Sequence, residues 1–246
     1  MLTKRFPALS HPLLLSIFFF AGLEVAFALQ RLVIPVMLTL VGIVIAGIAF
    51  IRYEELGRFK PYQMILPGIA VAALTAFTLF LPVNAWLHVY MLFAAACLYL
   101  VLTLGAKQAY PTWNLIISLI ILLIALASIL GSRFHLYVPV VLALGLAFAI
   151  TTLIVAQTMV RYRESSPEAW LLSCVMGFTA AQLLWVLQFL PLHFMVQSGV
   201  ILAVLYVGTG LAAAQAEGAL TKKVVLQHIG LSITAVATLL LTARWQ

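Results

Sequence analysis

The sequence contains no aspartate and only six acidic residues, all of them glutamate, among 246 residues. Charged residues make up 8% of the chain, whereas soluble proteins carry about 25%. Without aspartate, aspartyl intramembrane proteases and enzymes that hold a metal with aspartates are excluded. The two cysteines, Cys97 and Cys174, lie within apolar runs, where a thiol behaves as a small hydrophobic group. They indicate neither a disulfide framework nor a metal site.

Catalytic and cofactor motifs are also missing. The chain has no Gly-x-Ser-x-Gly, no His-Glu-x-x-His and no phosphate-binding loop. Gly208-x-Gly210-x-x-Ala213 matches the dinucleotide fingerprint in spacing, but it lies in an apolar run that no strand precedes. We interpret it as a helix-packing motif and expect no cofactor and no metal.

Hydrophobic residues, in contrast, make up 65% of the chain, and the mean hydropathy is +1.21. Runs of around 20 apolar residues are long enough for a helix to cross ~30 Å of hydrocarbon. Such runs cover residues 12–30, 32–52, 64–82, 85–105, 113–131, 136–159, 169–190, 196–216 and 223–243. Backbone groups in lipid must be satisfied within each segment, so the sequence predicts an all-α integral membrane protein, a bundle of about nine transmembrane helices.

The placement of Lys and Arg predicts the orientation of this bundle. Ten of the thirteen fall in one set of alternate loops, and only Arg31, Arg133 and Arg244 fall in the other. Because cytoplasmic loops retain positive charge, the N-terminus is expected in the cytoplasm and the C-terminus outside the plasma (cell inner) membrane. The first apolar run also resembles a secretory signal, whose cleavage would leave eight spans without changing the later orientation.

The loops between the apolar runs are short. We therefore expect a single transmembrane helical domain over residues 1–246 with no soluble domain, in which most consecutive helices form tight antiparallel hairpins. Four hairpins and a lone ninth helix fit the positions of the turns. The basic balance favours contact with the anionic head groups of cytoplasmic-leaflet lipids, and not with nucleic acid, because no basic stretch is long enough to leave the bilayer.

Glu24 is the most informative single residue, because it is the only acidic side chain within a span. An unpaired charge at the bilayer centre costs ~2.5 kcal/mol or more, so Glu24 must be paired, protonated or facing water. Polar residues of similar expected depth could surround it in an outward-facing pocket. The candidate pocket comprises Glu24, Arg31, His88, Arg133, His135, Gln182, Gln188 and His193. The alternative is a structural ion pair that only holds two helices together.

Two further patterns concern helix packing. Thr179, Gln182, Trp185 and Gln188 recur every three residues, and we expect this stripe to face protein, through interhelical hydrogen bonds or along a substrate path. Three small residues at intervals of four allow another helix to approach closely, which makes other membrane proteins possible partners. They are Gly210, Ala214 and Gly218.

Three functions are compatible with these features. The first hypothesis is a small transporter-like bundle, or one that binds a lipid or solute at the outward-facing polar pocket. The second is a membrane scaffold or assembly subunit that binds other membrane proteins. The third is an intramembrane enzyme acting on a lipid-linked substrate, with Glu24 or an external histidine as acid or base. The enzyme comes last because no catalytic pair is fixed by spacing.

Overall fold

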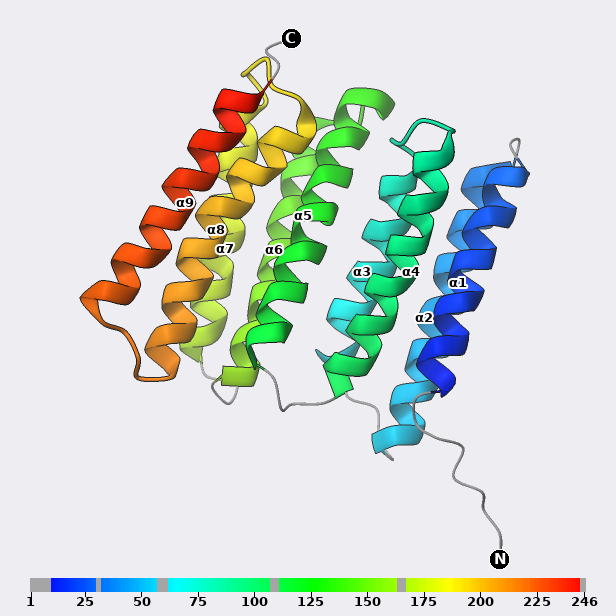
Figure 1. The fold of residues 1–246 in the computed structure, drawn as a ribbon, viewed down its shortest axis with the longest axis horizontal. Helices are drawn as coiled ribbons and strands as arrows, with labels where there is room; N and C mark the ends of the chain where they lie inside the picture. Colours follow the sequence, from blue (N-terminus) through cyan, green and yellow to red (C-terminus); the bar gives the residue numbers. More distant parts are fainter. Residues whose placement is uncertain (1–9, 30–31, 57–61, 107–110, 163–166, 244–246) are drawn as a thin grey trace, which may run out of the picture. The chain divides into compact units, whose positions relative to one another are not determined.

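The structure, a computed structural model, describes residues 10–29, 32–56, 62–106, 111–162 and 167–243. In these ranges the chain forms nine α-helices (Figure 1). They are α1 Ser10–Ala28, α2 Val33–Leu56, α3 Tyr62–Thr78, α4 Ala85–Ala106, α5 Pro111–Leu136, α6 Val140–Tyr162, α7 Pro167–Leu187, α8 Phe194–Ala216 and α9 Lys222–Thr242. The all-helical fold predicted from the apolar runs is confirmed.

Eight of the nine helices are long and apolar enough to cross a membrane, and α3 is the exception. With 17 residues, α3 is about 26 Å long at about 1.5 Å per residue, which is shorter than ~30 Å of hydrocarbon. The amide groups of Leu79, Phe80 and Leu81 donate to carbonyls three residues earlier, at 3.1 to 3.3 Å. These tighter hydrogen bonds end the helix at Thr78, before the expected end of the span at residue 82.

Contacts divide the chain into two compact units, and each is described by itself. The N-terminal unit covers Met1–Ile117, and the C-terminal unit covers Ser118–Gln246. In the N-terminal unit, α1 packs against α2 and α4, and α3 packs against the same two helices, so the four helices form a closed ring (Figure 1). Phe19, Leu23 and Ala26 recur at helical spacing on α1 and are fully buried.

In the C-terminal unit, α7 packs between its sequence neighbours α6 and α8, and α8 also contacts α6 and α9. Gly177 shows why α6 and α7 approach so closely. A Cβ atom at this glycine would lie 2.7 Å from the carbonyl oxygen of Phe148 on α6. Only a residue without a side chain fits this contact, so the two backbones can come together.

The last helix, α9, lies along α8 and is joined to it by a short turn (Figure 1). It therefore forms a further antiparallel pair with α8, where a lone ninth helix was expected. Gly199 and Gly210 of α8 face Leu239 and His228 of α9, which confirms a packing role for the glycine at position 210. Among the described side chains of α9, Ser232 is the one that is buried.

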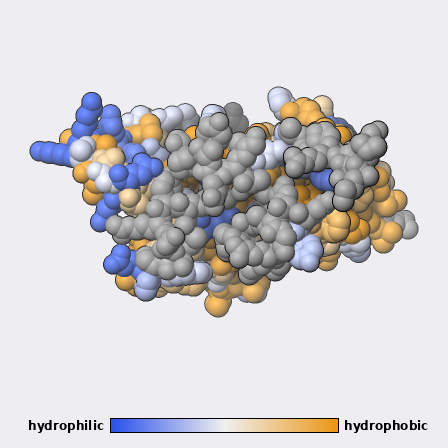
Figure 2. All heavy atoms as spheres, turned by 90° about the horizontal axis from the view of Figure 1, so that it is seen from below, coloured by the Kyte–Doolittle hydropathy of each residue, from blue (hydrophilic) through white to orange (hydrophobic). Residues whose placement is uncertain are grey.

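The α8–α9 turn also explains the position of Gly218. Its backbone has φ 70°, a left-handed conformation that glycine adopts readily just after a helix. Gly218 therefore follows the C-cap of α8, Glu217, and lies outside the helical ridge in which Gly210 and Ala214 sit. Thr221 then caps α9 by accepting a hydrogen bond from the amide of Val224. Figure 2 shows hydrophilic residues gathered around this turn and hydrophobic residues on the helix flanks.

Candidate functional site

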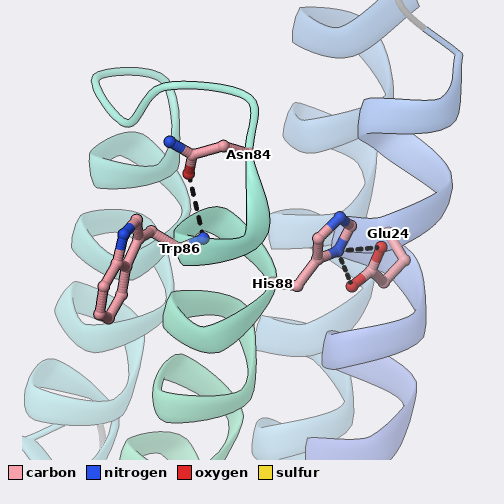
Figure 3. A network of polar contacts seen from close by, with 4 residues as sticks. All are labelled: Glu24, Asn84, Trp86 and His88. Atoms are coloured by element: carbon pink, nitrogen blue, oxygen red, sulfur yellow. Dashed lines mark hydrogen bonds and ion pairs between the residues drawn. The ribbon is translucent and has the colours of Figure 1, made fainter.

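The structure brings together Glu24 of α1 and His88 of α4. His88 Nδ1 lies 2.8 Å from one carboxylate oxygen of Glu24 and 3.1 Å from the other. Figure 3 shows the two side chains pointing toward one another from neighbouring helices. At these distances the imidazole N–H donates to the carboxylate, and the contact is an ion pair whenever His88 is protonated.

The pair is accessible and lies close to the helix ends. The side chain of His88 is 61% exposed and that of Glu24 is 31% exposed. Glu24 precedes the end of α1 at Ala28 by four residues, or about 6 Å along the helix axis. His88 is the fourth residue of α4. Both groups therefore lie within about one turn of the helix ends.

Contacts on the opposite side of α4 hold His88 in position. The hydroxyl of Tyr90 donates to the carbonyl of Leu74 on α3 at 3.1 Å, and its ring lies 5.1 Å from that of Phe77. Asn84 accepts a hydrogen bond from the amide of Trp86 at the start of α4 (Figure 3). The indole of Trp86 is 72% exposed, as is typical of a tryptophan at a membrane interface.

A second polar group lies in the C-terminal unit. The rings of His135 and His193 both contact Phe194 at the start of α8, at centroid distances of 5.8 Å and 4.3 Å. His193 also caps α8 by accepting a hydrogen bond from the amide of Met195. Arg133, two residues before His135, is half-buried. The two histidines meet at Phe194 because the end of α5 and the α7–α8 turn lie together there.

The stripe on α7 does not face protein along its whole length. Gln182 is exposed, Trp185 is 45% exposed, and the hydroxyl of Thr179 donates within its own helix to Val175. Steps of three residues turn by about 300°, so the stripe shifts by about 60° at each step. Gln188 ends up half-buried, and its Oε1 has no hydrogen-bond partner within the described ranges.

The eight residues of the candidate pocket are thus distributed over two groups. Glu24 and His88 belong to the N-terminal unit, and Arg31 lies outside the described residues. Arg133, His135, Gln182, Gln188 and His193 belong to the C-terminal unit. That all of them line one outward-facing pocket stays a prediction.

Sequence reasoning missed Gln197, which is fully buried near the start of α8. Its Nε2 donates to the carbonyls of Leu190 and Leu192, at 3.3 Å and 3.0 Å, and so ties α8 to the preceding turn. A polar residue inside an apolar run was the available signal, because such residues in membrane helices need partners within the protein.

An apolar groove of about 460 Å³ runs between α1 and α2 in the N-terminal unit. Its α1 wall includes Ala21 and Val25, which lie about 60° and 100° around the helix from Glu24, both on the same side of it. Thr39 is the one lining residue with a polar side chain, and its hydroxyl donates to Pro35 in the same helix. The groove therefore offers a hydrocarbon surface beside the Glu24–His88 pair.

Comparison with known proteins identifies a family and no function. No curated protein and no solved structure matches the chain. One family model matches residues 51–242, which cover the end of α2 and all of α3 to α9. His88 lies inside this match and Glu24 lies before it. Since the match covers most of the chain, the protein belongs to the family described as protein of unknown function (DUF5656).

Proposed function

We propose that this chain is a multi-pass protein of the plasma membrane, a small transporter-like bundle that binds a solute or a lipid head group at an outward-facing site formed by Glu24 and His88. The observation that carries the proposal is the contact between these two side chains, at 2.8 Å and 3.1 Å, on helices that are apolar enough to cross a membrane. Ionisable groups within membrane helices mark sites of solute or ion handling more often than chance allows.

The charge distribution supports the orientation of this site. Ten Lys and Arg residues against three favour an N-terminus in the cytoplasm and a C-terminus outside, if all nine helices cross the membrane. The short α3 then crosses as the third span. The Glu24–His88 pair lies at the end of α1 and the start of α4, which this topology assigns to the outer face.

The exposure of the pair supports binding over a purely structural role. A contact that only joins two helices is best enclosed between them, whereas most of the His88 side chain is open to its surroundings. The carboxylate can accept a hydrogen bond from a cationic group, and the imidazole N–H can donate a hydrogen bond to an anionic group. The apolar groove beside Glu24 would take the hydrophobic part of an amphiphilic ligand.

The experiment uses purified protein, both in liposomes and in detergent. In liposomes, a trapped pH-sensitive dye reports proton flux driven by an imposed sodium gradient. In detergent, mass spectrometry identifies lipids and solutes that co-purify. Glu24→Gln keeps an oxygen that can accept from His88 but removes the charge. Glu217→Gln, at the exposed end of α8, is the matched control because it removes the same charge elsewhere.

The proposal expects Glu24→Gln to lose sodium-driven proton flux or a co-purifying ligand that the wild type and Glu217→Gln retain. If the wild type and both variants behave alike in both assays, the pair has a structural role and the proposal is wrong.

A scaffold is the second candidate, and the exposure of α9 favours it. Only 6% of the residues in its apolar stretch are buried, so most of α9 is free to contact another membrane helix. A scaffold would keep its partners in Glu24→Gln and lose them when Leu231, which is 59% exposed on α9, is changed to Ser. Loss of the co-purifying ligand in Glu24→Gln, with partners unchanged in Leu231→Ser, would favour the binding site.

A further inference from the structure

A second apolar groove lies in the C-terminal unit, where α7, α8 and α9 meet, with a volume of about 400 Å³. It is lined by Met176, Thr179, Val204, Val207, Gly208, Ile229, Ser232 and Ile233. The hydroxyl groups of the two polar residues in this set both donate hydrogen bonds within the protein. Thr179 donates to the carbonyl of Val175, and Ser232 donates to the carbonyl of Ala203. The groove therefore presents a hydrocarbon surface to whatever fills it.

The groove opens to the outside of the helices. Ile233 is 64% exposed, and Ile229 and Val204 are 39% and 38% exposed. The side chain of Met176 on α7 packs directly against Gly208 of α8 and forms one wall of the groove, because a Cβ at Gly208 would lie 2.6 Å from the Met176 sulfur. Since these helices are long and apolar enough to cross a membrane, the opening faces acyl chains.

Lys222, at the start of α9, lies on the same face as this groove. It precedes Ile229 by seven residues, which is within about 20° around the helix and about 10 Å along it. Lys223 is also exposed, but its position is about 120° around the helix from Ile229. Glu217, the C-cap of α8, is the acidic residue at this turn. Its single negative charge balances one of the two lysines, so the turn keeps a net positive charge.

We infer that α7, α8 and α9 form a binding site for an anionic glycerophospholipid, whose phosphate contacts Lys222 while one acyl chain lies in the groove. The groove residues of α9 lie about 10 to 16 Å below Lys222, and one leaflet of hydrocarbon is about 15 Å deep. A phosphate and the middle of its acyl chain have this separation. Charge and hydrocarbon surface thus lie on one helix face at the spacing of a single lipid.

A phospholipid fits this arrangement better than the other ligands that either part could bind. Inorganic phosphate would use the lysine and leave the groove empty. A neutral lipid would use the groove without the lysine. The inference is independent of the Glu24–His88 site, because no residue is shared between the two.

The test measures binding of dioleoylphosphatidylglycerol and dioleoylphosphatidylcholine to the purified full chain in detergent by native mass spectrometry. A lysine near a membrane surface contributes about 1 kcal/mol to lipid binding, so Lys222→Gln should weaken phosphatidylglycerol binding about fivefold. Lys223→Gln is the matched control, with the same charge removed from a different face, and should weaken binding less than twofold. Binding of phosphatidylcholine should change little in either variant.

The groove is tested by filling it. Ile229→Trp should reduce phosphatidylglycerol binding several-fold, while Leu231→Trp on another face of α9 should not. If Ile229→Trp lowers the thermal stability, the more exposed Ile233→Trp replaces it. Equal effects of Lys222→Gln and Lys223→Gln would mean diffuse attraction to charge and overturn the inference. Competition by inorganic phosphate, or full binding with the groove filled, would overturn it as well.

Discussion

Gly210 of α8 lies directly against the imidazole ring of His228 on α9. A Cβ atom at Gly210 would be 2.5 Å from Cδ2 and Nε2 of that ring, and the ring also packs against Tyr206 in a tilted arrangement, at a centroid distance of 5.1 Å. Because α9 packs on α8 through contacts of this kind, small residues on α8 determine where the last helix sits.

We therefore predict that Gly210→Ala destabilises the α8–α9 pair. The added methyl group must displace the His228 ring, which should cost about 1 to 3 kcal/mol, as overpacking in a dense interior does. Thermal unfolding in detergent measures the change. Gly145→Ala is the control, because nothing lies within 4 Å of a Cβ there and alanine is a better helix former than glycine. The control should be neutral or stabilising, and equal loss in both variants would contradict the prediction.

A second prediction concerns the coupling between Glu24 and His88. In a double-mutant cycle with Glu24→Leu and His88→Leu, the coupling free energy should be about 0.5 to 1 kcal/mol, because the pair is exposed enough for solvent and head groups to compete. Unfolding in detergent at fixed pH gives the four free energies. A coupling free energy near zero would show that the contact does not stabilise the packing of α1 against α4 in detergent.

A third prediction concerns Gln197, whose amide holds the α7–α8 turn. Gln197→Leu removes the donor to the carbonyls of Leu190 and Leu192 in a buried setting. Leaving these groups without that hydrogen bond should destabilise the protein by about 1 to 3 kcal/mol. Gln227→Leu, on the exposed surface of α9, is the matched substitution and should have little effect. Equal stability of the two variants would mean that the amide does not hold the turn.

The helices were predictable because hydrocarbon leaves the backbone no alternative, but their ends were not. Polar residues show where lipid stops, and a helix can continue past that point. Residues 132–135, which lie between the predicted spans 113–131 and 136–159, are helical. The helix α5 continues to Leu136, and the chain turns at Tyr137, with φ 55°, shortly before Pro139. The backbone conformation there depends on local contacts that hydropathy does not encode.

The partner of Glu24 illustrates the limit for the candidate site. Its position in a span predicted that it needs a partner, and His88 was one of several candidates at similar depth. The choice among them depends on which helices are neighbours, and α1 lies beside α4 as well as α2. Apolar periodicity shows that a helix has a buried face without showing which helix covers it.

The final prediction concerns the topology on which the outward-facing site depends. In a chain with Cys174 replaced by Ala, Val83→Cys in the α3–α4 turn and Ala219→Cys in the α8–α9 turn each introduce one exposed thiol, since Cys97 is buried. The count of ten basic residues against three predicts that a membrane-impermeant maleimide applied to intact cells labels position 83 and not position 219. Permeabilised cells provide the control, because both positions should then react. Labelling of both positions in intact cells would place the two turns on one side, and an even number of spans between them would then replace the proposed arrangement, together with the assignment of Glu24 and His88 to the outer face.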